Sequence, residues 1–192
     1  ELFPSELDRK KADGMLLSFE NRPLVAIAPG SIWATKCWLI ERYTSLAKEL
    51  AARGYGIVLI GGKSDLDKCL AIEKAVQDTP GTVLNLAGKT YLLESAAVIG
   101  NCRLMLCNDS GALHIANAMQ TRVFAFFGPT VQSIGYYPYR EGDRIFETEL
   151  DCRPCGSHGH HKCPLKHHDC MRRIEVQPVL HAIQEAIPKA GY

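Results

Sequence analysis

The chain has 192 residues, of which 46% are hydrophobic and 22% are charged, and its formal net charge is +1. This composition excludes a disordered chain, and the near-neutral charge argues against a general nucleic-acid binder, which carries a basic excess. No apolar run approaches the about 20 residues that a membrane-spanning helix needs, so we expect no transmembrane segment.

The first 22 residues are polar, with scattered apolar positions. They lack the basic region of a secretory signal peptide, and the chain does not start with Met. Ser5 is a suitable N-cap, and Glu6 and Asp8 suit the first turn of a helix, so we expect a helix over residues 5–13. We interpret residues 1–22 as a connector from a further N-terminal domain, and residues 23–192 as one domain.

From residue 24, short apolar runs alternate with segments of helical periodicity. This alternation predicts an α/β fold with a Rossmann-like, doubly wound parallel sheet, whose apolar strands are covered on both faces. The expected strands are residues 24–28, 57–60, 83–86, 104–107 and 122–127, with one further strand near 144–147. The expected helices are residues 39–53, 65–77 with Ser64 as its N-cap, 92–99, 110–119 and a C-terminal helix 175–187.

The eight cysteines fall into two groups. Four lie among apolar residues and are expected to be buried, reduced thiols: Cys37, Cys69, Cys102 and Cys107. The others lie in a Cys/His-rich loop, residues 151–172, with the spacing C-x2-C-x7-C-x6-C: Cys152, Cys155, Cys163 and Cys170. Without a secretory signal this spacing favours a metal over disulfides, and four thiolates suit a closed structural zinc site. Reduced thiols and a disulfide pair are the alternatives, and the loop's histidines are either bystanders or replacement ligands.

Ligands of an open parallel sheet bind beyond the carboxyl ends of its strands, so the turns there should converge on one rim. The turn after the fourth expected strand is the most informative: Asp109-Ser110-Gly111-Ala112-Leu113-His114. Asp109 or Ser110 would cap the following helix, and Gly111 would leave the first amides uncovered. Free amides at a helix N-terminus bind diphosphates, and His114 lies one turn into the helix. The alternative is that Asp109 only caps and His114 only packs.

Two other turns carry residues suited to a nucleotide. Lys36, after the first expected strand, would neutralise a phosphate, or else it is an ordinary solvated lysine. Gly61 and Gly62 would let a base or ribose lie against the backbone. Asp65 would bind ribose hydroxyls, or else it is a first-turn carboxylate of the next helix. The chain has neither a G-x-G-x-x-G after the first strand nor a Walker A lysine motif, which disfavours a dinucleotide-dependent oxidoreductase and a P-loop ATPase.

Together these segments resemble glycosyltransferase family 9, the lipopolysaccharide heptosyltransferases. The resemblance covers about residues 24–187 in the family's order and spacing, which makes it more specific than a single motif. The segments that carry it are Pro29-Gly30-Ser31, Lys36-Cys37-Trp38, Asn85-Leu86-Ala87-Gly88-Lys89-Thr90, Asn108-Asp109-Ser110-Gly111-Ala112-Leu113-His114-Ile115-Ala116 and Phe127-Gly128-Pro129-Thr130. Family members more often have Ala-Lys-Arg-Trp before the first helix, whereas this chain has Ala34-Thr35-Lys36-Cys37-Trp38, which shifts the spacing of Lys36.

The resemblance implies one half of a two-domain GT-B enzyme, the half that binds the sugar nucleotide. The turn at Asp109 would face the diphosphate and the heptose, Lys36 would stabilise the leaving ADP, and Asp65 would lie near the adenosine. The turn at Gly128 would border the sugar. The substrate-binding residues implied in this way are Gly30, Ser31, Lys36, Gly61, Gly62, Asp65, Gly88, Asp109, Ser110, Gly111, Ala112, His114, Gly128, Pro129 and Thr130.

The implied reaction is transfer of heptose from ADP-heptose to the lipopolysaccharide inner core, with inversion and without a catalytic metal or other cofactor. The acceptor and the general base would belong to the N-terminal domain, and the expected location is cytoplasmic, at the inner face of the bacterial inner membrane. Nucleic acid is not an expected partner. The alternatives are a glycosyltransferase with another nucleotide sugar and a non-catalytic, zinc-bearing interaction domain.

Overall fold

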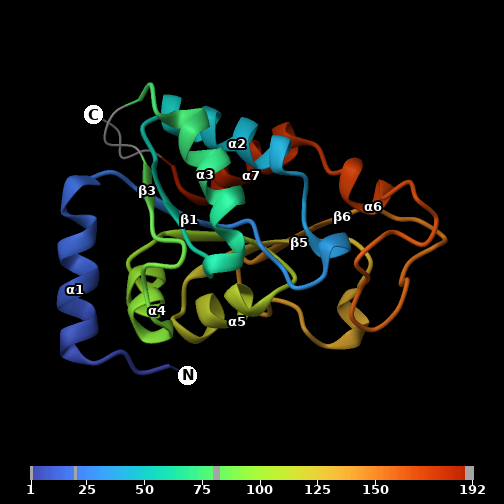
Figure 1. Ribbon diagram of the computed structural model, residues 1–192, viewed down its shortest axis with the longest axis horizontal. Helices are drawn as coiled ribbons and strands as arrows, with labels where there is room; N and C mark the ends of the chain where they lie inside the picture. The colour runs from blue at the N-terminus through green and yellow to red at the C-terminus, as the bar shows by residue number, and fades with distance from the viewer. Residues whose placement is uncertain (1, 20, 80–82, 189–192) are drawn as a thin grey trace.

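Strands and helices alternate along the chain in the computed structural model, which describes residues 2–19, 21–79 and 83–188. The six strands form one sheet in the order β3-β2-β1-β4-β5-β6, and every neighbouring pair is parallel (Figure 1). The strands are β1 Leu24–Ala28, β2 Gly56–Leu59, β3 Val83–Asn85, β4 Leu104–Asn108, β5 Arg122–Phe127 and β6 Arg144–Glu147. The predicted α/β fold with a doubly wound parallel sheet is therefore confirmed.

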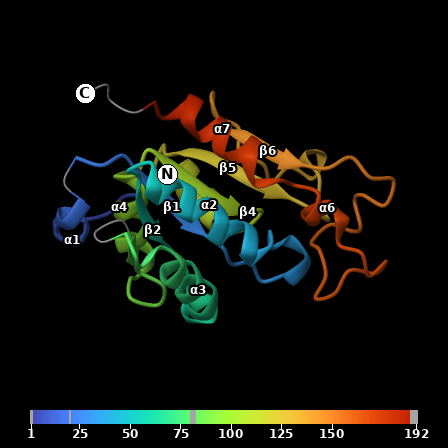
Figure 2. The ribbon, with the colours of Figure 1, turned by 90° about the horizontal axis from the view of Figure 1, so that it is seen from above.

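Helices cover both faces of the sheet, as right-handed parallel crossovers require. Helices α2, α3 and α7 pack on one face, while α1, α4 and α5 pack on the other (Figures 1 and 2). The helices are α1 Glu6–Leu16, α2 Ile40–Ala52, α3 Leu66–Val76, α4 Leu92–Gly100, α5 Gly111–Ala118, α6 Asp169–Arg172 and α7 Val176–Ala186. The short helix α6 was not predicted.

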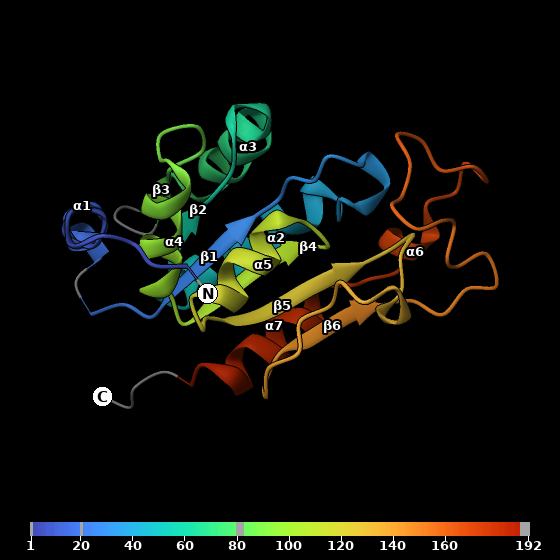
Figure 3. The same cartoon turned by 90° about the horizontal axis from the view of Figure 1, so that it is seen from below.

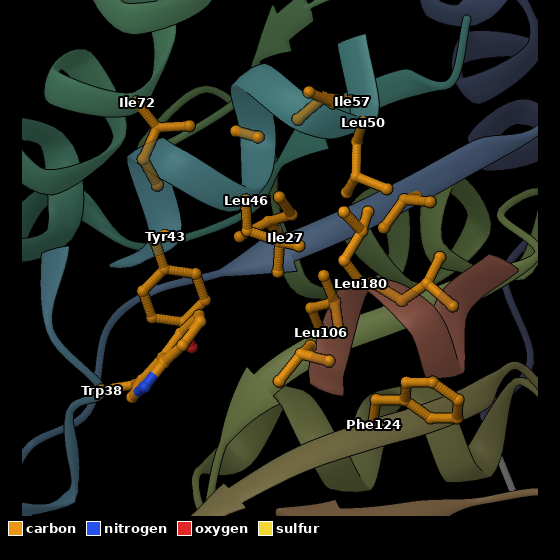
Figure 4. Close-up of a cluster of buried hydrophobic side chains, with 14 of the residues drawn as sticks. Ile27, Trp38, Tyr43, Leu46, Leu50, Ile57, Ile72, Leu106, Phe124 and Leu180 are labelled. Atoms are coloured by element: carbon orange, nitrogen blue, oxygen red, sulfur yellow. The ribbon is translucent and has the colours of Figure 1, made fainter. Parts of the chain in front are cut away.

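Alternate strand residues supply the two cores, because successive side chains of a strand point to opposite faces. Val25 and Ile27 face α2, whereas Ala26 faces α4. Figure 4 shows part of the core on the face that carries α2, α3 and α7, including Trp38. The Trp38 ring stacks on Phe126 with centroids 4.1 Å apart, and its Nε1 donates to the carbonyl of Ile174 at 3.0 Å. Deleting such a buried aromatic ring typically destabilises a protein by about 3–5 kcal/mol. Trp38 thus fixes the segment that follows β1, which carries Lys36.

The N-terminal helix begins as the sequence predicts. The Ser5 hydroxyl accepts from the amide of Asp8 at 3.2 Å, and the Asp8 carboxylate accepts from the amide of Ser5 at 2.9 Å, which completes a capping box. Helix α1 packs against α4, and Lys11 donates to Glu94 at 2.6 Å. Residues 5–16 are therefore held on the face of the sheet that carries α4 and α5.

One predicted cap is wrong. Ser64 lies inside a 3₁₀ turn, Lys63–Asp65, and α3 begins only at Leu66, with Asp65 at the N-cap position. The Asp65 side chain does not cap α3 either, because its carboxylate folds back to accept from the amide of Gly62 at 3.0 Å. An intervening 3₁₀ turn has no periodicity of its own and was not visible in the sequence.

No helix in residues 2–19, 21–79 and 83–188 is long and apolar enough to cross a membrane.

Candidate functional site

Two adjoining pockets open where β1 and β4 end. They share Ser31 and Ile32 from the turn after β1, and Ser110 and Gly111 from the turn after β4. The larger pocket has a volume of about 540 Å³ and the smaller one about 340 Å³. Strands β1 and β4 are neighbours, and the strand order runs from β1 to β3 on one side and from β4 to β6 on the other (Figure 3). Open α/β sheets bind their ligands at such a switch point, where the order changes direction.

The buried Asn108, at the end of β4, joins the two turns at this switch point. Its Nδ2 donates to the carbonyls of Pro29 at 3.0 Å and Gly30 at 3.1 Å. Its Oδ1 accepts from the amide of Trp38 at 2.9 Å and the hydroxyl of Tyr43 at 3.1 Å. With donors and acceptor both used, Asn108 is a satisfied buried amide that fixes the turn after β1 against β4.

The larger pocket extends over the turn after β2, as predicted for Gly61, Gly62 and Asp65. A β-carbon on Gly30 would lie 2.0 Å from Asp65 Oδ1, and one on Gly61 would lie 2.8 Å from Asp65 Cβ. Residues 30 and 61 must therefore be glycine for the Asp65 carboxylate to occupy its observed position. Several lining residues were not predicted as site residues: Ala28, Ile32, Ile60, Ser64, Lys68, Thr90, Leu92, Ser95 and Ile115.

The smaller pocket contains Lys36, Asp109 and His114, which the sequence predicted, and Tyr136, which it did not. The His114 ring stands edge-on to Tyr136, with centroids 6.3 Å apart. Four other lining residues were also missed: Ile32, Trp33, Ser157 and His158. Ser157 and His158 come from the Cys/His-rich loop, whose cysteine spacing and histidines indicated a metal and not a place in this pocket. The loop lies at the end of the sheet to which the strands point (Figure 3).

Lys36 and Asp109 form an ion pair that Thr130 completes. Lys36 Nζ lies 2.6 Å from Asp109 Oδ2, and the Thr130 hydroxyl donates to the same oxygen at 2.7 Å. The side chains of Lys36 and Asp109 are 12% and 6% exposed. A buried carboxylate with two donors is well compensated, so this arrangement holds the lysine ammonium in a fixed position at the pocket wall.

The start of α5 lies between the two pockets and is not capped by a side chain. Asp109 is occupied by Lys36 and Thr130, and Ser110, at the N-cap position, makes no cap bond. The prediction that one of them caps α5 is therefore wrong. The buried Ser110 Oγ has no partner among the residues that the structure describes, and a β-carbon on Gly111 would meet nothing within 4 Å. The first amides of a helix lack intrahelical acceptors, so this end of α5 can receive an anion.

The turn after β5 lies behind the pockets instead of lining them. Thr130 is buried beneath Asp109, and a β-carbon on Gly128 would lie 2.9 Å from Met171 Cε. The carbonyl of Pro129 accepts from the amide of Cys155 at 2.9 Å. In the turn after β3, Thr90 lines the larger pocket. Gly88 contacts it only indirectly, because the amide of Gly88 donates to the carbonyl of Gly61 at 2.9 Å. Neither Gly88 nor residues 128–130 line the two pockets.

The first group of cysteines behaves largely as expected. Cys69, Cys102 and Cys107 are buried and free, whereas Cys37 is free but only half-buried. Burial raises the pKa of Cys69 and of Cys102 to about 12, so these thiols are protonated at neutral pH. We assign them a packing role.

The four cysteines of the Cys/His-rich loop are also free. Burial is the main reason that the pKa of Cys170 is raised to about 11. The neighbouring thiols of Cys155, Cys163 and Cys152 raise this pKa further, and the positive charge of Arg153 opposes the increase. Among residues 2–19, 21–79 and 83–188, no three His, Cys, Asp or Glu side chains are arranged to hold a metal ion. The described side chains therefore do not confirm the predicted zinc site.

Comparisons with known proteins place the chain in a family. A model of glycosyltransferase family 9 (heptosyltransferase) matches residues 4–166. Lipooligosaccharide heptosyltransferase 2 of Campylobacter jejuni serotype O:6 is 26% identical over 176 residues, which cover 91% of this chain and 55% of that protein. Lipooligosaccharide heptosyltransferase 2 of Haemophilus influenzae is 34% identical over 123 residues, which cover 63% of this chain and 36% of that protein.

A solved structure agrees over nearly the whole chain. ADP-heptose LPS heptosyltransferase II of E. coli superposes with a TM-score of 0.79 at 26% sequence identity, covering 97% of this chain and 53% of that one. This chain thus spans about half the length of the Campylobacter relative and of the solved structure. The resemblance predicted from the residues is confirmed, and the chain belongs to glycosyltransferase family 9.

Proposed function

We propose that the chain is the donor-binding half of an inverting glycosyltransferase, which transfers heptose from ADP-heptose to the inner core of lipopolysaccharide. The observation that carries the proposal is the start of α5, between two pockets. There the Ser110 hydroxyl has no hydrogen-bond partner in the described part of the chain, and Gly111 is open. One pocket has the volume of a nucleoside site, and the other contains Lys36. Membership of the heptosyltransferase family supports the donor class.

In this proposal the adenosine occupies the larger pocket and the heptose the smaller one. The Asp65 carboxylate, 20% exposed, accepts hydrogen bonds from the ribose hydroxyls. The diphosphate bridges the pockets and binds the first amides of α5 and the Ser110 hydroxyl. Tyr136 and His114 then border the heptose.

The transfer forms one bond and breaks one. An acceptor hydroxyl oxygen attacks the anomeric carbon, and the bond from that carbon to the diphosphate oxygen breaks with its electron pair, which releases ADP. Negative charge grows on the departing diphosphate, and the helix amides and Lys36 stabilise it because they are already oriented toward it. We therefore assign Lys36 as the catalytic residue of this chain, because its ammonium stabilises the leaving diphosphate.

The acceptor hydroxyl must also lose a proton to a base. We assign no base within residues 1–192 and expect it, with the acceptor site, in the part of the relatives that this chain does not cover. The proposed location, at the cytoplasmic face of the inner membrane, follows from the family resemblance. No cofactor enters the proposed transfer step.

Nucleotide titration tests the proposal. Calorimetry of the purified chain should give measurable binding of ADP and much weaker binding of UDP and GDP, because the base lies against the turn after β2. The variant Lys36→Ala should bind ADP about tenfold more weakly, as expected for one lost charge-assisted hydrogen bond. Preference for UDP or GDP would indicate another nucleotide sugar. Failure to bind any nucleotide would contradict the proposal and favour the non-catalytic interaction domain.

A structural zinc ion in the Cys/His-rich loop is a separate proposal that rests on the cysteine spacing alone, since the described geometry does not form the site. Elemental analysis of chain purified without chelators should find about one zinc per chain if Cys152, Cys155, Cys163 and Cys170 bind it. The variant Cys152→Ser should then lose the metal. Absence of zinc from the wild-type chain would remove this proposal and leave the transfer proposal intact.

A further inference from the structure

Arg153 connects the Cys/His-rich loop to the turn after β5. Its side chain is only 5% exposed, and its guanidinium donates to the carbonyl of Gly128. It also donates to the carbonyls of Thr130 at 2.9 Å and Thr148 at 2.5 Å, and pairs with Glu147 at 2.7 Å. The planar fork of an arginine is suited to several acceptors in one plane, which a lysine cannot replace.

The turn that Arg153 fixes holds the ion pair of the smaller pocket. Arg153 Nη2 binds the carbonyl of Thr130, and the hydroxyl of the same residue donates to Asp109 Oδ2 at 2.7 Å. That oxygen in turn accepts from Lys36 Nζ at 2.6 Å. A continuous series of hydrogen bonds thus runs from Arg153 to the lysine ammonium at the pocket wall.

The same loop holds Lys36 from its other side. The amide and hydroxyl of Thr35 donate to the carbonyl of His160 at 3.0 and 2.8 Å, and the amide of His160 donates to the Thr35 hydroxyl at 2.8 Å. His168 Nε2 lies 2.9 Å from the carbonyl of Thr35. Thr35 is buried and directly precedes Lys36, so the Cys/His-rich loop contacts both ends of the Lys36–Asp109–Thr130 arrangement.

We propose that Arg153 is a positioning residue for the diphosphate. It fixes Thr130, which holds Asp109, and Asp109 in turn holds Lys36. This inference rests on the proposed function. Replacing the guanidinium with an apolar side chain leaves the carbonyls of Gly128 and Thr130 without their donor in a nearly buried site. The turn then relaxes, Thr130 no longer fixes Asp109, and the ammonium loses its set position. The larger pocket does not contact Arg153, so nucleoside binding should be unaffected.

The test compares ADP with adenosine, because only ADP carries the group that Lys36 faces. NMR titration, which measures weak affinities, is applied to the full chain and to Arg153→Met. We expect ADP affinity to fall about tenfold, as for one lost charge-assisted contact, and adenosine affinity to change less than about twofold. Arg153→Lys should recover only part of the loss. In a Lys36→Met background, Arg153→Met should have little further effect.

Two controls keep the test decisive. Arg144→Met removes the arginine that begins the edge strand β6, which is 47% exposed and pairs with Glu185, and it should leave both affinities unchanged. Thr130→Val removes the hydroxyl that donates to Asp109. It therefore tests the same contact if Arg153→Met does not fold. Unchanged ADP affinity in Arg153→Met, or in Thr130→Val, overturns the inference, as does an equal loss for ADP and adenosine. A wild-type chain that binds neither ligand overturns the proposed function itself.

Discussion

Ser110 and Gly111 are the residues on which the donor site depends. A serine at an N-cap position usually bonds to the second or third amide of its helix, but here it does not. Its buried oxygen has no partner in the described part of the chain, although buried polar atoms are nearly always satisfied. An oxygen-rich anion at the start of α5 would satisfy both the hydroxyl and the first amides.

The variant Gly111→Ala should change stability and binding in opposite directions. A β-carbon there meets nothing in the protein, and alanine favours a helix over glycine by about 0.5–1 kcal/mol, so the thermal midpoint should rise slightly. Gly111 lines both pockets, so an added methyl group there should lower ADP affinity. Calorimetry and thermal unfolding of the same preparation measure both effects. Unchanged ADP affinity would indicate that the diphosphate binds elsewhere.

The Asp109 carboxylate has a structural role as well. The variant Asp109→Asn leaves Lys36 as a mostly buried, unpaired charge, so we expect unfolding in urea to require about 3 kcal/mol less free energy. The double variant Asp109→Asn/Lys36→Met, which also removes the ammonium, should recover most of that loss. If the single and double variants are equally destabilised, the ion pair does not hold the site.

At this scale the sequence predicted residues better than their contacts. Lys36 was predicted in the turn after the first strand and Asp109 and His114 in the turn after the fourth, and the three residues do line one pocket. Asp109 or Ser110 was expected to cap α5. The sequence does not show that Lys36, 73 residues away, binds the Asp109 carboxylate. Ser157 and His158 could not be predicted either, since their place in the pocket depends on how an irregular loop folds.

The elements were easier to predict than the loops, because burial imposes a period on them. Apolar runs marked β1 and β5 to the residue, and even the short edge strand β6 was located. The Cys/His-rich loop has no such period. Its position on Thr35 and Pro129 is decided by hydrogen bonds between segments more than 20 residues apart, such as that from the amide of Cys155 to the carbonyl of Pro129.

The packing of α1 on α4 should depend on pH through Glu94. Hydrogen bonds from Lys11 and from the amide of Tyr91 lower the pKa of Glu94 below its ordinary 4.5. A carboxyl with a lowered folded pKa stabilises the folded state above its unfolded pKa, and this contribution is lost as the pH falls through the folded value. Amide exchange in α1 should therefore accelerate below about pH 4.5.

The variant Glu94→Gln is the control for that effect. It keeps the size of the side chain and removes its charge, so exchange in α1 should be faster at neutral pH and less sensitive to acid than in the wild-type chain. The remaining acid sensitivity comes from Asp8, whose pKa is lowered by its hydrogen bonds to Ser5 in the capping box. A wild-type α1 whose exchange, corrected for intrinsic rates, is the same on both sides of pH 4.5 would show that the Lys11–Glu94 contact does not hold the helix.

For the molecule as a whole, the strand order explains where the site lies. The chain moves from β1 outward to β3 and then returns to place β4 on the other side of β1. The crossovers therefore diverge between β1 and β4, and the turns that end these strands border an open crevice. Alternating strands and helices in the sequence predicted the parallel sheet and this edge, but the exact volumes of the two pockets depend on side chains such as Ile32 and Tyr136.

The direct test of the account is an NMR titration that follows the amides of Gly111 and Ala112. If the start of α5 binds the diphosphate, both resonances should shift strongly as ADP is added and only slightly as adenosine is added. Residues of the larger pocket, such as Gly62, should respond to both ligands. Saturating ADP that leaves the Gly111 and Ala112 amides unmoved would contradict the central claim.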